Sequence, residues 1–326
     1  MSLLARLLVA ATAPARHLDL RSRHIERMLG MRLAETDIRL VRQAGGSTPI
    51  GAYYHWYLQK LLVARAIRKL DRERALALVQ AMDHTDYTAA QPIIDSPTGV
   101  IVAIPHHAHY ILSMTALAGR LGKHRPVNVF YGQPATHKGN EVFDRMHEVL
   151  FSPLASGVDI MHDNRQGLAK AIKGLKNGEI VVIMPDAFQD EDATMMVPFL
   201  GRLMNTMLGT AILARKTGSW ILPVVSKLHR NRLAFMTHFG TRLDHPAGSS
   251  GLPARQARIR DYAVTRDVFQ QFEAAMRDEA YLWQHVRGHF ANSAMHLVDK
   301  EALPGMLEAM ENAPPFRAPD LALDLT

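Results

Sequence analysis

The sequence predicts an α/β protein, in which a doubly wound sheet core follows an N-terminal helical region. Short β-branched runs alternate with helix-like segments from residue 100 onward, a pattern typical of sheets covered by helices. The 326 residues are 48 % hydrophobic and 21 % charged, which supplies a large core and gives no sign of disorder. Chains of this length often fold as one α/β unit with a helical appendage. We expect helices over residues 1–95, the core over 96–300 and a tail over 301–326.

The N-terminal segment is not expected to cross a membrane. Residues 3–11 are apolar but are interrupted by Arg6, and they fall far short of the ~20 residues that a helical span requires. The basic start of a signal peptide is absent. The chain also has no cysteine, so it forms no disulfide or thiolate metal site, and a reducing compartment is the default. We therefore expect a cytoplasmic location, with at most peripheral contact with the inner membrane.

The basic excess of the chain lies in its first 74 residues, where fourteen Lys or Arg accompany six Asp or Glu. A basic amphipathic helix is predicted at the end of this region. Its apolar stripe is formed by Leu58, Leu62, Ala66 and Leu70. Its basic residues are Lys60, Arg65, Arg68, Lys69, Arg72 and Arg74. Such a helix contacts an acidic carrier protein, anionic lipid headgroups or a nucleotide phosphate, or else its basic side faces solvent. No nucleic-acid-binding motif accompanies it, so a nucleic acid is not an expected partner.

Five β-branched runs are the expected strands of the core. They are Val100–Ile104, Val127–Tyr131, Val158–Met161, Ile180–Met184 and Trp220–Val225. A further strand is predicted at Leu233–His238 after a turn at His229–Arg232, and a helix is predicted at Val264–Glu279. From Ala302 onward, four prolines predict a short helix followed by an extended end.

Three histidines follow the first of these strands, in the stretch Pro105-His106-His107-Ala108-His109. The carboxyl edge of an open α/β sheet is where ligands and catalytic groups gather. A histidine there serves as a general base, or three histidines bind a zinc ion with an open water position. In the metal hypothesis, His162 or Asp163 after a neighbouring strand completes the site. Adjacent residues such as His106 and His107 rarely point the same way in regular structure, which disfavours the metal hypothesis.

Four blocks of the sequence resemble those of one enzyme family, in the same order. They are Pro105–Leu112, Gly178–Asp186, Pro198–Arg202 with the segment as far as Gly218, and Tyr281–Trp283 with His285 and Arg287. The first is similar to a Pro-His-x-Gly-Asn-Trp-Glu element and the second to a Gly-Glu-strand-Pro-Asp block. Together the blocks resemble the bacterial lipid A biosynthesis (lauroyl/myristoyl) acyltransferases, a branch of the glycerolipid acyltransferase superfamily. The resemblance covers roughly Gly99 to Phe290, and four blocks in the correct order make a fairly specific signal.

The resemblance implies a glycerolipid-acyltransferase-like mixed sheet flanked by helices, with an active-site base at His106. In the family this histidine removes a proton from an acceptor hydroxyl or amine, which attacks an acyl thioester, and an acid five residues later orients the ring. Here the position of that acid is Ile111, and neither His107 nor His109 restores the spacing. The arginine that the family tends to carry after its second strand is Gly132 in this chain. Two polar side chains of the family, the acid and the arginine, are therefore missing at these positions.

Two hypotheses accommodate the missing acid. In the first, the protein is an acyltransferase in which His109, Asp186 or an acid within residues 190–192 assists His106. His106 and His109 share a face if a helix begins at this point. In the second, the protein is a catalytically weak or inactive homologue that binds an acyl carrier protein or a partner enzyme, because Ile111 removes polarity from the pocket. The retained Pro105-His106 pair favours altered catalysis over none.

The resemblance also implies substrate contacts and a co-substrate. The expected substrate-binding residues are His107, Gly201, Arg202, Thr206, His285 and Arg287. Arg215 is a further phosphate-binding candidate by analogy, and the methionines at 184, 195, 196, 204 and 207 line an acyl tunnel or fill the core. We expect no bound cofactor, and an acyl carrier protein or coenzyme A thioester as donor. The expected acceptor is a soluble amine or alcohol in specialised-metabolite or lipid biosynthesis.

Overall fold

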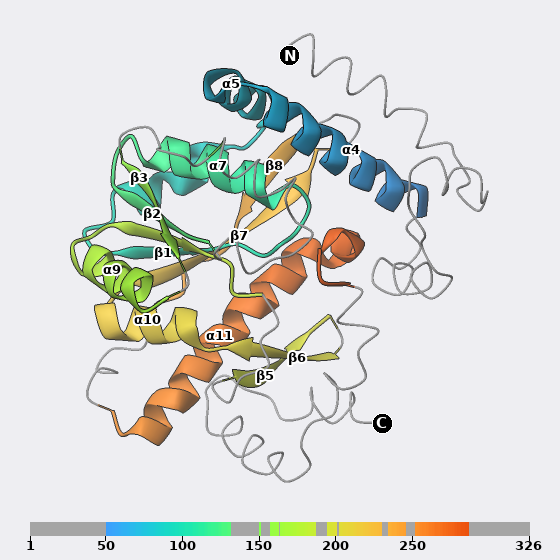
Figure 1. The fold of residues 1–326 in the computed structure, drawn as a ribbon. Coiled ribbons are helices and arrows are strands. Elements are labelled where there is room, and N and C mark those ends of the chain that lie inside the picture. The colour runs from blue at the N-terminus through green and yellow to red at the C-terminus, as the bar shows by residue number, and fades with distance from the viewer. Residues whose placement is uncertain are drawn as a thin grey trace.

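The computed structural model describes residues 50–131, 150, 157–162, 164–186, 194–200, 202–229, 234–245 and 252–286 (Figure 1). Before the sheet lie α4 (Ile50–Lys69), α5 (Arg72–Met82), the 3-10 helix η2 (Tyr87–Ala90) and α6 (Gln91–Ile94). The first turn of α5 is capped, because the Asp71 carboxylate accepts a hydrogen bond of 2.9 Å from the Arg74 N–H. The expected proline-rich tail lies outside the described residues.

A six-stranded sheet forms the centre of the protein. Its strands are β1 (Val100–Ala103), β2 (Val127–Tyr131), β3 (Val158–His162), β4 (Ile180–Ile183), β7 (Trp220–Leu228) and β8 (Phe235–Phe239). Their order is β3-β2-β4-β1-β7-β8, and every neighbouring pair is parallel except β7 and β8. The mixed α/β sheet that we expected is therefore confirmed.

Helices cover both faces of this sheet (Figure 1). One face carries α4, α5 and α7 (Tyr110–Leu121), and the other carries α9 (Arg165–Lys176), α10 (Gly209–Thr217) and α11 (Ala254–Met276). Side-chain alternation along β1 divides the core in two, since Val100 and Val102 pack on the α7 side whereas Ile101 and Ala103 pack on the α11 side. Among the described residues, no helix combines the length and the apolar composition needed to cross a membrane.

The sequence analysis did not predict the antiparallel hairpin of β5 (Thr194–Phe199) and β6 (Arg202–Met207). The hairpin packs against α11, apart from the main sheet (Figure 1). Pro198 lies within β5, and proline is depleted from strand interiors, so the segment does not read as a strand. Met195 and Met204 are buried in the core on the α11 side. These two methionines therefore act as core filler, one of the two roles that we considered for them.

Two further elements are longer than expected. Strand β7 continues to Leu228, and its partner β8 begins at Phe235, two residues after the predicted start. Helix α11 begins at Ala254, ten residues before the predicted Val264, and leads into the 3-10 helix η5 (Arg277–Leu282). The first turns of α11 are mostly exposed, so this part of the sequence carries no apolar stripe that would reveal the helix.

The buried face of α4 differs from the predicted one. Leu62, Ala66 and Leu70 of the expected stripe are only half-buried. Among the α4 side chains that the structure describes, the buried ones are Trp56, Gln59, Val63, Ala64 and Ile67. The helix is therefore rotated relative to the prediction, and Lys60, which we placed with the solvated basic residues, lies at the edge of the buried face.

Candidate active site

Two polar residues meet at the carboxyl edge of the sheet because β1 and β4 are parallel neighbours. The register pairs Ala103, the last residue of β1, with Ile183, the last residue of β4. Three residues beyond each of these positions stand His106 and Asp186. The two strands end level with each other, and each chain continues for three more residues, so the two side chains meet. His106 Nδ1 lies 2.7 Å from Asp186 Oδ1. This pair, which we call the dyad, comes from positions eighty residues apart.

Asp186 is fully buried and accepts three hydrogen bonds. Its Oδ2 atom accepts from the His106 backbone N–H and from the Trp283 indole N–H, each at 2.7 Å, and its Oδ1 atom contacts the His106 ring. Burial alone would raise the pKa of Asp186, but the charge and hydrogen bond of His106, the charge of His285 and the Trp283 bond lower it to about 2. The carboxylate is therefore ionised. A carboxylate only accepts hydrogen bonds, so His106 Nδ1 is the donor in this contact, and Nε2 is the ring nitrogen that is left for a substrate.

The His106 ring lies between two other rings. Tyr110 and His285 contact it edge-on, with ring centroids 4.7 and 4.9 Å away. Burial lowers the pKa of His285 to about 4; the positive charges of His106 and Lys60 act in the same direction and the Asp186 carboxylate against it. His285 is therefore neutral at physiological pH. The side chain of His106 is 15 % exposed, so a ligand has access to it whereas Asp186 is sealed.

The segment after η5 fixes the loop that carries His106. His107 forms an isolated antiparallel bridge with Trp283, and the Gln284 N–H donates to the His106 carbonyl at 2.9 Å. The Ala108 N–H donates to the Leu282 carbonyl at 3.2 Å. Ala108 has a φ of +49°, a left-handed conformation that is uncommon for a residue with a side chain. The C-terminal signature Tyr281–Trp283 thus contributes a hydrogen-bond donor to the dyad, through the Trp283 indole.

His107 does not have a free nitrogen for a substrate. Its ring is completely buried, with Nδ1 2.7 Å from the Ser226 carbonyl and Nε2 2.9 Å from the Glu279 carbonyl. Both nitrogens are occupied by the backbone, one at the end of β7 and one in η5. The expectation that His107 contacts substrate is therefore wrong, and the residue instead ties the active-site loop to two neighbouring elements.

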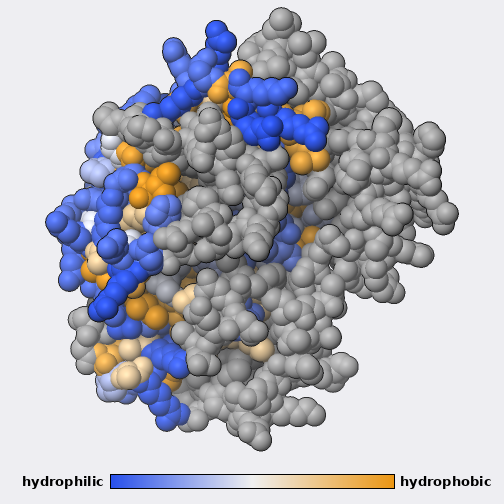
Figure 2. Space-filling model, viewed as in Figure 1, coloured by the Kyte–Doolittle hydropathy of each residue, from blue (hydrophilic) through white to orange (hydrophobic). Residues whose placement is uncertain are grey.

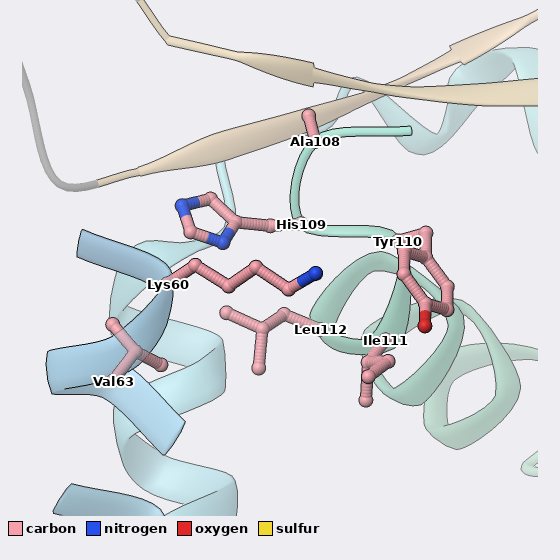
Figure 3. A pocket seen from close by; sticks show the side chains of 7 residues that line it. All are labelled: Lys60, Val63, Ala108, His109, Tyr110, Ile111 and Leu112. Atoms are coloured by element: carbon pink, nitrogen blue, oxygen red, sulfur yellow. The ribbon is translucent and has the colours of Figure 1, made fainter. Parts of the chain in front are cut away.

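The proposed pairing of His106 with His109 on one helix face is also wrong. Helix α7 begins at Tyr110, so both histidines precede it and helical spacing does not relate them. His109 instead lines a small pocket beside Lys60 (Figure 3). Of the three candidates for the missing acid, Asp186 is the one that contacts His106, and residues 190–192 lie outside the described residues.

Thr206 and Arg215, two further residues expected to bind substrate or phosphate, contact other parts of the protein. Thr206 is buried and its hydroxyl donates to the Pro185 carbonyl at 2.9 Å, so it braces the loop that carries Asp186. Arg215 forms a two-pronged ion pair with Asp261, at 2.9 and 2.8 Å, and thereby ties α10 to α11. Gly201, the side chain of Arg202, and Arg287 lie outside the described residues.

The metal hypothesis required His106, His107 and His109 to converge, and they do not. The candidate ligand set among the described residues is His106, Asp186 and His285, whose ligand atoms lie within 4.8 Å of one another. A bridging zinc ion would lie about 2 Å from each ligand and would hold a nitrogen and an oxygen further apart than the 2.7 Å seen between His106 and Asp186. The contact has the geometry of a hydrogen bond, and the fourth histidine candidate, His162, is not part of this set.

Comparison with known proteins matches the sequence of this chain to one family. The sequence model of a family described as bacterial lipid A biosynthesis acyltransferase matches residues 80–287. The match includes the dyad, Trp283 and His285, and it excludes α4. A search of curated protein sequences found no significant match.

Proposed function

The chain belongs to the bacterial lipid A biosynthesis acyltransferase family, and from this premise we propose that it transfers an acyl group with the His106–Asp186 dyad as its general base. The donor is a thioester of an acyl carrier protein or of coenzyme A. The acceptor is an amine or a hydroxyl compound of specialised-metabolite or lipid biosynthesis. The observation that supports this proposal best is the 2.7 Å contact between His106 Nδ1 and a buried, ionised Asp186.

The chemistry follows from the state of the His106 ring. Nε2 removes the proton of the acceptor N–H or O–H as that nitrogen or oxygen attacks the thioester carbonyl carbon. The carbon–sulfur bond then breaks, and the departing thiolate takes the proton from Nε2, so the ring returns to its neutral state. Asp186 remains a carboxylate throughout and stabilises the transient imidazolium. An acid five residues after His106 is not required, because Asp186 occupies that role from another strand.

We further propose that the exposed basic face of α4 receives an acidic acyl carrier protein. Arg65, Arg68 and Lys69 are exposed and line a shallow groove with Leu62 and Ala66. Hydrophilic residues gather over α4 and α5, with apolar residues among them (Figure 2). Opposite charge on the partner would steer it to this face. Contact of the same face with an anionic membrane is the competing possibility.

The decisive experiment is intact-mass detection of acyl transfer. Acyl carrier protein and coenzyme A thioesters are offered with pooled amine and alcohol acceptors to the wild type, His106→Ala and Asp186→Asn. General-base catalysis contributes about 10²–10⁴-fold, so we expect transfer to vanish with His106→Ala and to fall by about tenfold or more with Asp186→Asn.

Asp261→Asn is the matched control, because Asp261 is a buried carboxylate that also contacts a histidine, His245, at 3.0 Å. We expect this variant to lose stability and to keep its rate per folded molecule. Equal transfer by wild type and His106→Ala would overturn the assignment of the base. Absence of transfer by every protein, together with binding of an acyl carrier protein, would support the alternative of an inactive homologue that binds a carrier protein.

A further inference from the structure

The buried carboxylate of the dyad has a further partner, the indole of Trp283, to which the proposed mechanism gives no role. Trp283 follows η5 in the chain and is 1 % exposed. Its Nε1–H donates to Asp186 Oδ2 at 2.7 Å. Hydrogen bonds from an N–H group to an ionised carboxylate are shorter and roughly twice as strong as those between neutral groups. The indole is therefore able to act on the base His106 through its acid.

The donors around Asp186 divide its two oxygens between them. Oδ2 accepts from the Trp283 indole and from the His106 backbone N–H, each at 2.7 Å, whereas Oδ1 faces the His106 ring. A carboxylate that turned about its Cβ–Cγ bond would weaken these hydrogen bonds together. The two N–H groups on Oδ2 therefore hold the plane of the carboxylate and keep Oδ1 directed at His106 Nδ1.

Trp283 is itself held by other parts of the fold, so its indole N–H is a stationary donor. Phe199, at the end of β5, contacts the indole edge-on, with ring centroids 5.0 Å apart. The Trp283 backbone N–H donates to the Ala280 carbonyl at 3.0 Å, and the residue forms a bridge with His107. Donors that are fixed before a reaction need no reorganisation while charge develops. The indole is thus placed to keep the carboxylate in one orientation throughout the proposed reaction.

The need of a buried indole for an acceptor does not by itself account for this contact. A buried indole N–H usually finds a hydrogen-bond partner, and Trp220, which is 2 % exposed, donates to the neutral Ser96 hydroxyl at 2.9 Å. The acceptor of Trp283 is instead an ionised carboxylate that faces a histidine ring. Comparison of the two tryptophans therefore separates a structural role from a role in the dyad.

We propose that Trp283 is a positioning residue of the dyad. Its indole N–H holds the Asp186 carboxylate toward His106, and the oriented carboxylate keeps the proton of the neutral ring on Nδ1, so that Nε2 is available to a substrate. The effect of Trp283 on acyl transfer rests on the proposed function, whereas its effect on the His106 ring does not. A segment ninety-seven residues beyond Asp186 thereby sets the state of the base.

Nitrogen-15 NMR of the His106 ring tests the proposal without any need for acyl transfer. The two nitrogens of a neutral imidazole give different signals according to which of them carries the proton. The spectrum of His106→Gln identifies the His106 signals, and in the wild type we expect the proton on Nδ1. Trp283→Phe keeps an aromatic ring against Phe199 and removes the N–H. We expect this variant to contain both tautomers, with a several-fold larger share of the Nε2–H form than in the wild type.

Trp220→Phe is the matched control, because it also removes the N–H of a buried indole, at the amino end of β7. We expect this variant to lose stability and to keep the wild-type signals of His106. An unchanged tautomer in Trp283→Phe, or the same change in both variants, would overturn the proposal.

A second replacement covers the case in which Trp283→Phe does not fold. The chain has three tryptophans, so in a Trp56→Phe, Trp220→Phe background Trp283 alone is replaced when benzothienylalanine is supplied instead of tryptophan. This residue keeps the bicyclic shape and has sulfur in place of the N–H. We expect the same mixture of tautomers, and retention of the wild-type tautomer would overturn the proposal.

Steady-state acyl transfer then measures the consequence for the proposed reaction. A small misplacement of a catalytic group costs up to about 10²-fold in rate, so Trp283→Phe should lower kcat by about tenfold. The KM should change little, because the buried indole does not reach a substrate, and Trp220→Phe should keep the wild-type kcat. A change of tautomer without acyl transfer by any of the proteins would support the positioning role and count against the proposed function. A wild-type kcat in Trp283→Phe would overturn the role of Trp283 in transfer.

Discussion

At the scale of single residues, the proposed base His106 has a carboxylate at its ring although no acid stands five residues later in the chain. Asp186 reaches His106 Nδ1 from a neighbouring strand, and the Trp283 indole and a backbone N–H hold the carboxylate in position. The neutral partners around the dyad matter as well. His285 and His109 are both buried enough to stay uncharged, which leaves His106 as the ring that changes charge in the proposed mechanism.

The buried histidines predict that stability falls in mild acid. The folded pKa of His109 is about 3 and that of His285 about 4, whereas an unfolded histidine has a pKa near 6.5. Below that value the unfolded chain binds more protons, so each such histidine should lower the free energy of unfolding by about 1.4 kcal/mol per pH unit. Urea unfolding at pH 7, 6 and 5 measures the slope. His109→Gln should reduce this slope by the contribution of one histidine. Replacement of the exposed His124 should leave the slope unchanged.

Sequence reasoning singled out His106 and Asp186, but it did not predict the contact between their side chains. His106 and Asp186 were both candidates because each follows a buried strand. Their contact depends on the register of β1 with β4, which the sequence does not reveal. His109 would share a helix face with His106 if a helix began at His106, but α7 begins at Tyr110. The role of the Trp283 indole had no signal in the sequence beyond its presence in the family signature.

At the scale of elements, the sequence pattern identified the buried helices and strands more reliably than the exposed ones. The strands of the main sheet are buried β-branched runs, and they lie close to where we predicted them. Helix α11 starts with exposed turns and the hairpin β5–β6 contains a proline, so neither gives a clear periodic pattern. The buried face of α4 was predicted at the wrong positions, because its half-buried leucines lie next to the buried residues.

Substitutions on α4 test directly which face of the helix is buried. Ile67 is fully buried in the core, whereas Leu62 is half-buried. Loss of a large buried side chain costs about 2–5 kcal/mol, so Ile67→Ala should lower the free energy of unfolding by that amount. Leu62→Ala should cost clearly less. Chemical denaturation of both variants measures the two free energies of unfolding. A greater loss for Leu62→Ala would show that the helix face predicted from the sequence is the buried one.

The hairpin contacts the loop of Asp186 through the Thr206 hydroxyl. Thr206→Val keeps the shape of the side chain and removes the bond to the Pro185 carbonyl, next to Asp186. We expect a loss of about 1 kcal/mol, because the carbonyl of the half-buried Pro185 is left without this donor, and a fall in kcat without a matching rise in KM. Thr237→Val is the control, since the buried Thr237 hydroxyl has no hydrogen-bond partner among the described residues. A comparable loss in both variants would argue against a bracing role for Thr206.

At the scale of the whole molecule, the sheet separates two cores and concentrates chemistry at one edge. The carboxyl ends of β1, β4 and β7 all contribute to that edge, through His106, Asp186 and the Ser226 carbonyl that binds His107. The helical region before the sheet supplies Lys60 to the same edge and presents its basic residues outward. One helix, α4, thus faces both the candidate active site and the surface proposed to receive the donor.

Charge reversal on that surface tests how the donor arrives. Replacement of Arg65, Arg68 and Lys69 by Glu should raise the KM for an acyl carrier protein thioester by about tenfold and reduce its dependence on salt. The KM for acyl-pantetheine, which has no carrier protein, should stay the same. Steady-state kinetics at low and high ionic strength measure both values.

The same charge change on α9, made with Arg165, Lys173 and Lys176, controls for net charge, because these exposed residues lie on the other face of the sheet. Equal effects of the two triple variants would show that overall charge, rather than the α4 face, governs encounter with the carrier. Loss of binding to anionic vesicles by the α4 variant, with unchanged carrier kinetics, would assign the face to a membrane.

The eighty residues that separate His106 from Asp186, and the further ninety-seven from Asp186 to Trp283, also affect synthesis of the protein. A growing chain exposes His106 long before either partner has left the ribosome, and its imidazole then has no carboxylate to select its tautomer. The dyad and its indole partner are therefore complete only after synthesis has passed Trp283, close to the end of the described fold.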